Sequence, residues 1–333
     1  MKVNQLIAKH NQNFSTYYSG ELYSHTPMAL IALRDLGASE KRLTEFYDFD
    51  TKKLEPIKKE SKSISDENWK KTFGEYELES SYFKYFRDIV EKNGINKTVE
   101  KFFDILMEGV GAAAFHPIIR LSYAVREDNS DEVAISLATW AASFVNLNVN
   151  SKLSEESGLI DILKSFQALN FNDNSKIETD NIATRMRKVS EDKFYKELNS
   201  TITLSDLDKD KLESSLLWLY SQTNNFTLLH AVTSHYAFEN LVQFSVNKVE
   251  SRVYFWKAIL AAYLSTTGVV KIDMGWKYPM IEKLPSWDEL KNKAIESNDD
   301  HVIKLVHILN LKRKESLDYE LRYASALKLN MLR

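Results

Sequence analysis

The sequence contains no cysteine, and it is poor in glycine and proline. Its 333 residues include 9 glycines and 5 prolines. Without cysteine the chain has no disulfide bond, no thiolate-bound iron–sulfur cluster and no thiol nucleophile. So few turn-forming residues also argue against a β architecture built on many tight turns. A reducing compartment suits such a chain, and we expect a cytoplasmic location.

Long apolar runs and an excess of one charge are also missing. The longest apolar candidate, Ala258 to Leu264, is far shorter than the ~20 residues of a membrane span, so we expect no membrane association. Met1 to Leu6 has no apolar core, which predicts no secretion signal. The net charge is -3 and basic residues are mixed with acidic ones, so we expect no nucleic-acid partner.

The apolar residues that are present follow a helical spacing nearly throughout. Val133, Leu137, Trp140 and Phe144 form one such stripe, and strict alternation of apolar and polar residues is rare. The pattern predicts an all-α fold of about 12 to 16 helices. We expect a single large multi-helix domain over residues 1–333 with a central histidine-rich pocket.

Three polar stretches are expected to be loops: residues 50–66, 169–182 and 268–287. The second is a possible mid-chain excursion from the domain. The first is rich in lysine, with acidic residues interleaved, and we interpret it as a solvated segment rather than a binding patch.

Histidine is the most informative residue type in this chain. Two histidines stand just before prolines, in His25-Thr26-Pro27 and His116-Pro117. Proline favours the first turn of a helix, so both should stand at helix entrances, with Thr26 and His116 as the caps. His230 and His301 lie in other apolar stretches. His10 and His307 are expected to be surface or helix-face residues and are not counted as ligands.

Neutral imidazole is the commonest metal ligand in proteins, and this chain has no thiol to compete with it. Three or four histidines from different helices would suit iron, copper, zinc or nickel. The alternative for each is a helix-cap residue or a hydrogen-bonded core histidine. Other catalytic signatures are absent: the sequence has no His-Glu-x-x-His, no Gly-x-Ser-x-Gly and no dinucleotide fingerprint.

Four further polar residues lie near these histidines in the sequence. Arg120, four residues after His116, either clamps a substrate carboxylate or phenolate or bridges to a nearby Asp. Tyr123 is a candidate acid–base or hydrogen-bonding group. Lys304 either binds an anion or is solvated, and we favour solvation. His235 competes with His230 as a ligand, although five residues turn a helix by about 500° and place it on another face.

The histidine segments occur in the order of a known family. They are His25-Thr26-Pro27-Met28-Ala29, Phe115-His116-Pro117-Ile118-Ile119-Arg120, His230-Ala231-Val232-Thr233 and Asp300-His301-Val302-Ile303-Lys304. Together they span most of the chain, which resembles the questin oxidase-like proteins. The resemblance implies an all-helical oxygenase that uses dioxygen on small aromatic, quinone-like substrates such as anthraquinones.

The resemblance also implies a cofactor. Some members are non-haem iron enzymes with a histidine-rich site and a carboxylated lysine; others are Baeyer–Villiger-type oxidases that use NADPH. The implied ligands of iron, or of another first-row divalent metal, are His25, His116, His230 and His301. Lys257 is our candidate for the lysine, because burial would lower its pKa toward the neutral amine that carbon dioxide attacks. In the alternative, Lys257 extends to the surface.

Three functions are therefore compared. The first is a metal-dependent oxygenase with Arg120 and Tyr123 as catalytic candidates. The second is a metal-free, NADPH-dependent Baeyer–Villiger-type oxidase. The third is a non-enzymatic helical interaction protein in which the histidines are structural.

Overall fold

A computed structural model describes residues 2–59, 62–147, 181–191, 195, 209–266, 273, 275–313 and 317–332. Helices make up nearly all of the regular structure, which confirms the all-α prediction. The strands in these ranges are β1 (Tyr17–Tyr18) and β2 (Leu22–Tyr23), which form one antiparallel hairpin. Residues 169–180 of the expected excursion lie outside the described residues. No described helix is long and apolar enough to span a membrane.

Two compact units can be distinguished in the chain. One comprises Met1–Lys58, Leu217–Asn224 and Met274–Arg333, and is called unit 1 below. The other, unit 2, comprises Lys59–Leu216 and Asn225–Asp273. Both units draw on segments far apart in the sequence. Whether they act as one domain stays a prediction.

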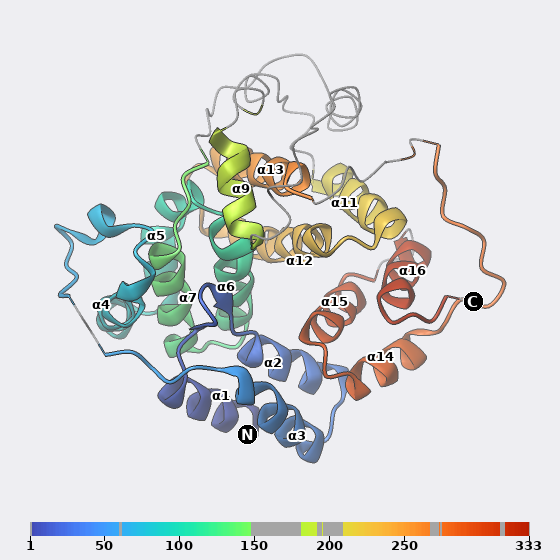
Figure 1. Cartoon of the computed structure of the whole chain (residues 1–333), viewed down its shortest axis with the longest axis horizontal. Coiled ribbons are helices and arrows are strands. Elements are labelled where there is room, and N and C mark those ends of the chain that lie inside the picture. The colour runs from blue at the N-terminus through green and yellow to red at the C-terminus, as the bar shows by residue number, and fades with distance from the viewer. Residues whose placement is uncertain are drawn as a thin grey trace. The chain divides into compact units, whose positions relative to one another are not determined.

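Unit 1 is built from helices of the two ends of the chain. In Figure 1, α2 lies beside α15, although one is near the N-terminus and the other near the C-terminus. Helix α2 also packs against α1 and α3, so its residues from Thr26 to Leu33 are all buried. The helices of unit 1 are α1 (Lys2–Asn13), α2 (Thr26–Leu36), α3 (Glu40–Asp50), α14 (Trp287–Glu296), α15 (Asp300–Leu311) and α16 (Asp318–Lys328), with the second half of α11 (Lys209–Thr223) and the 3-10 turn η1 (Thr51–Lys53).

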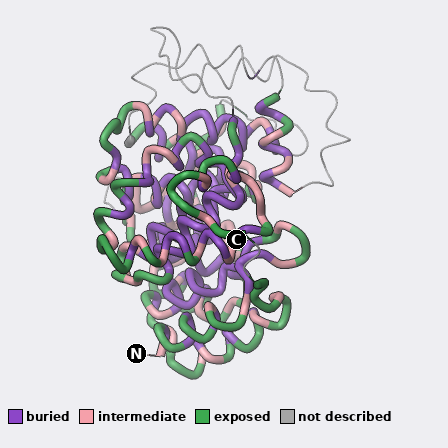
Figure 2. The backbone as a smooth tube through the Cα atoms, turned by 90° about the vertical axis from the view of Figure 1, so that its left-hand side faces the viewer, coloured by how far each residue is buried: buried purple, intermediate pink, exposed green. Residues whose placement is uncertain are grey.

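Unit 2 contains the middle of the chain. Its helix α7 packs against α4 and α6, and α12 packs against α6 and α13. Figure 2 shows buried residues along many helical turns and exposed residues at connections. The helices are α4 (Glu79–Asn93), α5 (Ile95–Met107), α6 (His116–Arg126), α7 (Ser130–Ala142), α9 (Ile182–Glu191), α12 (Phe226–Leu241) and α13 (Lys248–Leu264), with the first half of α11. The 3-10 turns are η2 (Trp69–Thr72), η3 (Tyr76–Leu78), η4 (Ala112–Phe115) and η7 (Val242–Phe244).

The starts of α2 and α6 are each one residue away from the prediction. In α2 the N-cap is His25, and Thr26 is already helical; the Thr26 hydroxyl donates to Asp50 instead of capping the helix. In α6 the N-cap is Phe115, with φ of 69°, and His116 is the first helical residue. The left-handed conformation of Phe115 already turns the chain into the helix, so His116 does not have to serve as the cap.

Backbone strain is concentrated just before α6. Three consecutive residues without glycine's freedom have positive φ: Ala113 (41°), Ala114 (56°) and Phe115 (69°). Each such residue costs about 1 kcal/mol or more, and such strain gathers at functional sites when packing holds it. All three side chains are buried. The strained turn places His116 at the entrance of α6.

Candidate functional site

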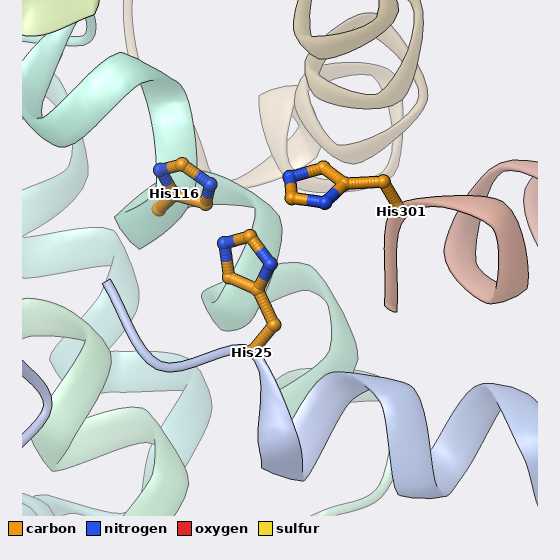
Figure 3. A group of neighbouring side chains, drawn as sticks. All are labelled: His25, His116 and His301. Carbon is orange, nitrogen blue, oxygen red and sulfur yellow. The ribbon is translucent and has the colours of Figure 1, made fainter. Parts of the chain in front are cut away.

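In unit 1 the structure brings His25 and His301 together. Their rings point toward one another from the starts of α2 and α15, with centroids 4.5 Å apart and planes at 76° (Figure 3). Figure 3 also labels His116, which belongs to unit 2. One oxygen of Asp300, Oδ1, lies 2.5 Å from Nδ1 of His25 and 2.8 Å from Nδ1 of His301. Two predicted ligands therefore share one carboxylate.

The charges of this cluster follow from its burial. Burial lowers the pKa of His25 to about 3, so its imidazole is neutral at pH 7. Burial opposes ionisation of Asp300, but the neighbouring His25 and His301 outweigh it and hold the pKa of its carboxyl well below the usual range. Asp300 is also the first residue of α15, where the positive end of the helix dipole favours an anion. The carboxylate is therefore charged and acts only as an acceptor.

A series of polar contacts extends from Asp300 through the exposed Lys53 to the first helix. Lys53 Nζ lies 3.6 Å from Asp300 Oδ2 and 2.6 Å from Asp50 Oδ1. Burial opposes the charge of Lys53, but Asp50 and Asp300 outweigh it and raise the pKa of Lys53 to about 12. Lys53 is exposed, as expected for a solvated segment, and its ammonium also pairs with the buried carboxylate of Asp50.

From Asp50, a series of hydrogen bonds continues to His10. Thr26 donates to Asp50 Oδ2 at 2.5 Å, Ser24 Oγ lies 3.3 Å from Thr26 Oγ1, and His10 Nε2 lies 2.9 Å from Ser24 Oγ. His10 is only 1% exposed, so the expectation of a surface residue is wrong, and it lies on the buried face of α1. The aliphatic neighbours of His10 form the buried face of α1, and Ser24 supplies the hydrogen bond that its ring needs.

Two more residues near α15 also differ from the prediction. Lys304 is 2% exposed rather than solvated, and burial lowers its pKa to about 8 although Asp300 lies 4.0 Å from Nζ. His307 is likewise buried rather than exposed, with Nε2 3.0 Å from Asp35 Oδ2. Both lie on α15, which packs against α2. This packing buries positions whose exposure the sequence of α15 does not decide.

In unit 2 the structure brings His116 and His230 together. Their Nε2 atoms lie 3.2 Å apart, with ring planes at 75°. Nδ1 of His116 is hydrogen-bonded to the carbonyl of Ala113, and Nδ1 of His230 lies 2.8 Å from the carbonyl of Phe226. A carbonyl oxygen only accepts, so each Nδ1 carries the proton. In two neutral rings, both Nε2 atoms then present lone pairs to one another.

This arrangement fits a metal ion. Two lone pairs at this distance repel unless a cation or a proton lies between them. Imidazole nitrogens bound at about 2.0–2.1 Å to one ion are roughly 2.9 to 3.4 Å apart for bond angles between 90° and the tetrahedral value. The observed 3.2 Å falls in that interval. Metal-bound imidazoles also commonly donate their other N–H to a carbonyl or a carboxylate, as His116 and His230 do here.

The competing ligand His235 has different surroundings from His230. It is also buried on α12, and its Nε2 lies 3.8 Å from Glu239 Oε1. Glu239 itself accepts two hydrogen bonds from Arg252, at 2.5 and 3.0 Å. His235 thus belongs to a charged group of its own on another face of the helix.

Lys257 lies in the interior of unit 2. Its residue exposure is 0%, which contradicts the alternative of a lysine that extends to the surface. Burial lowers the pKa of Lys257 to about 8. The lowered pKa that we predicted for this lysine is therefore present. Its role as a carboxylated ligand stays a prediction.

Arg120 and Tyr123, the catalytic candidates, are both buried on α6. Arg120 donates two hydrogen bonds of 2.8 Å to the two carboxylate oxygens of Glu132 on α7. The alternative of an ionic bridge is thus the one present, but its partner is a glutamate and not the predicted Asp. Tyr123 packs under Arg126, whose guanidinium carbon is 5.2 Å from the ring centroid.

Sequence reasoning missed the acidic partners of these side chains: Asp300, Asp50 and Glu132. Asp300 was visible as the residue before His301, at the start of a helix where a carboxylate is favoured. No local pattern indicates that it also faces His25, which is 275 positions away. Glu132 likewise pairs with Arg120 across two helices.

Fold and site together define an all-helical protein with buried histidine clusters suited to metal binding. The model of the questin oxidase-like family matches residues 22–309, and the chain belongs to this family. It is also 23% identical over 372 residues to the Baeyer-Villiger monooxygenase dmxR6 of Cryptosporiopsis sp. (strain 8999), covering 95% of this chain and 82% of that protein. The family and this relative support an oxidoreductase and count against a non-enzymatic interaction protein.

Proposed function

We propose that this protein is a metal-dependent oxygenase that acts on a planar aromatic, quinone-like substrate with dioxygen. The observation that carries the proposal is the pair of Nε2 atoms of His116 and His230, 3.2 Å apart, with both Nδ1 atoms bound to backbone carbonyls. A structural histidine pair would normally place a donor against an acceptor. Here both rings direct an acceptor to the same point, which is the requirement of a metal ligand pair.

The predicted ligands stay proposals within their own units. They are the pair His116 and His230 in unit 2 and the pair His25 and His301 in unit 1. Imidazole donors suit iron and other first-row divalent ions. A bound ferrous ion supplies the redox chemistry for the activation of dioxygen. Lys257 is proposed as the additional, carboxylated ligand. Lys304, equally buried and beside Asp300, meets the same physical requirement of a lowered pKa.

The residues of the chain have their own tasks in this proposal. The carbonyls of Ala113 and Phe226 hold the rings of His116 and His230 in one tautomer. The protein interior around them excludes water, which strengthens each electrostatic contact. Arg120 and Tyr123 stay predictions as substrate-contacting groups, and the paired hydrogen bonds from Arg120 to Glu132 support a structural role for the arginine.

The substrate class rests on the family and on the relative. The family's name refers to questin oxidase, and the relative's name refers to a Baeyer–Villiger monooxygenase, an enzyme that inserts an oxygen atom beside a carbonyl. A quinone offers such carbonyl groups on a flat ring system. The relative's name also favours the second candidate, a metal-free oxidase that uses NADPH. The cytoplasmic location stays a prediction.

One experiment separates the two candidates. The protein is purified without chelator, its metal content is measured by elemental analysis, and oxygen uptake is followed with a hydroxylated anthraquinone, with and without NADPH. We expect about one equivalent of iron or another first-row metal, loss of uptake after chelation, and recovery on addition of Fe²⁺. Undiminished, NADPH-dependent uptake by metal-free protein would contradict the metal proposal and favour the second candidate.

A further inference from the structure

We propose that Asp300 is a positioning residue and not a metal ligand. Its carboxylate holds His25 and His301 in one tautomer and one orientation, so that both present Nε2 to the metal ion. This inference rests on the proposed metal-dependent function, and it identifies the group that prepares two of the proposed ligands.

The contacts of Asp300 assign the tautomers. The Nδ1 atoms of both rings converge on the same oxygen, Oδ1, at 2.5 and 2.8 Å. A carboxylate oxygen accepts hydrogen bonds, and one oxygen that contacts two ring nitrogens is satisfied when each Nδ1 donates its N–H to it. An imidazole whose single N–H is on Nδ1 has its lone pair on Nε2. The rings are at 76° to one another, so the two Nδ1–H groups approach the oxygen from different directions.

A different interpretation makes Asp300 itself a ligand. Asp299, Asp300 and His301 each offer one ligand atom, and these atoms lie within 4.8 Å of one another. Two histidines and one carboxylate are also a common donor set of non-haem iron. In the structure, however, Oδ1 of Asp300 faces two N–H groups, while Oδ2 faces the ammonium of Lys53 at 3.6 Å. A metal ion at Asp300 would have to displace these contacts.

The surroundings of Asp300 hold it in this role. It starts α15, whose cap Asp299 accepts from the backbone N–H groups of His301 and Val302. Lys53 connects it to Asp50, and Asp50 accepts the hydroxyl of Thr26, the residue after His25. The carboxylate is thus tied to both helices that carry its histidines, and a ring of either one cannot turn without breaking a buried contact.

The first test is a Co²⁺ titration of metal-free protein, followed by calorimetry and by the visible absorption of the bound ion. Asp300→Asn keeps an oxygen for both N–H groups but removes the charge, which lowers the basicity of the two ligands. We expect Co²⁺ affinity to fall by about 10- to 100-fold, with unchanged stoichiometry and unchanged absorption bands. Asp318→Asn is the matched control, since Asp318 also starts a helix, α16, but pairs with Trp287 and Arg322. It should bind Co²⁺ as the wild type does.

Two results of this titration would overturn the inference. Altered absorption bands in Asp300→Asn would show that the carboxylate had been in the ligand set. Wild-type affinity in Asp300→Asn would show that Asp300 does not prepare the ligands. Circular dichroism of each variant verifies that it is folded before titration.

A second test does not depend on metal binding. Nuclear magnetic resonance of metal-free protein labelled with ¹⁵N-histidine reports which ring nitrogen is protonated. We expect His25 and His301, assigned with His25→Gln and His301→Gln, to be in the Nδ1–H form in the wild type, and to become mixed in Asp300→Ala. If the wild type binds no Co²⁺ but shows these tautomers, the proposed function fails while the assignment of Asp300 holds. Nε2–H forms in the wild type would overturn the assignment itself.

Discussion

His116 and His230, 114 positions apart in the sequence, place their Nε2 atoms 3.2 Å from one another, and each directs Nδ1 to a backbone carbonyl. In two neutral rings this geometry sets one lone pair against the other, and either a proton or a metal cation between the two Nε2 atoms removes the repulsion. A metal ion removes the repulsion between the lone pairs, and so should stabilise the folded protein by mass action.

We expect Fe²⁺ or Co²⁺ to raise the melting temperature of metal-free protein, and His116→Ala or His230→Ala to weaken this rise. His235→Asn is the matched control, because His235 is a buried histidine on the same helix as His230, in contact with Glu239. Thermal denaturation with increasing metal concentration measures the effect. A stronger loss in His235→Asn than in His230→Ala would make His235 the ligand.

The Arg120–Glu132 pair should contribute to stability rather than to substrate binding. Both side chains are at most 2% exposed, so removal of one partner leaves a buried charge that nothing compensates. We expect Glu132→Gln and Arg120→Met each to lower the free energy of unfolding by about 3–5 kcal/mol, measured by urea denaturation. The double variant Arg120→Met/Glu132→Leu should recover much of that loss. A folded Arg120→Met with normal stability and a raised KM would instead support the substrate clamp.

The strained turn before α6 should serve the orientation of His116. Glycine at position 114 removes the steric cost of the positive φ, and Ala114→Gly should increase stability by up to about 1 kcal/mol. The looser turn should also reduce metal affinity, because the carbonyl of Ala113 holds the His116 ring. Ser19→Gly, at a φ of 44° in unit 1, is the control that relieves strain without contact to His116. Equal metal affinity in both variants would argue against this role.

Lys257 should make the stability of the metal-free protein depend on pH. Burial lowers its pKa from 10.5 to about 8, so between these values the unfolded chain binds more protons than the folded one. The wild type should therefore become more stable relative to Lys257→Met as pH rises from 8 to 10.5, by at most about 1.4 kcal/mol per pH unit. Below pH 8 the difference should be constant. Urea denaturation across this pH range measures the difference in free energy of unfolding between the two proteins. A difference that does not change with pH would show that the ammonium group of Lys257 is solvated in the folded protein.

Much of the fold was predictable from the sequence because helical periodicity is a local property. The stripe from Val133 to Phe144 contains most of α7, and the prolines at positions 27 and 117 mark helix starts to within one residue. The errors concern burial. His10, His307 and Lys304 were expected at exposed positions, since polar residues on a helix are usually exposed, and the packing of neighbouring helices covers all three.

The sequence by itself determined the residue types available for chemistry and the helices that carry them: no thiol, a few histidines in apolar segments, and Lys257 within one. Tertiary structure alone decided the partners, because contacts such as His25 with Asp300 join positions 275 residues apart. A ring's tautomer depends on whether a carboxylate, a carbonyl or another imidazole faces it. That choice is made by packing between helices, which no local pattern in the chain encodes.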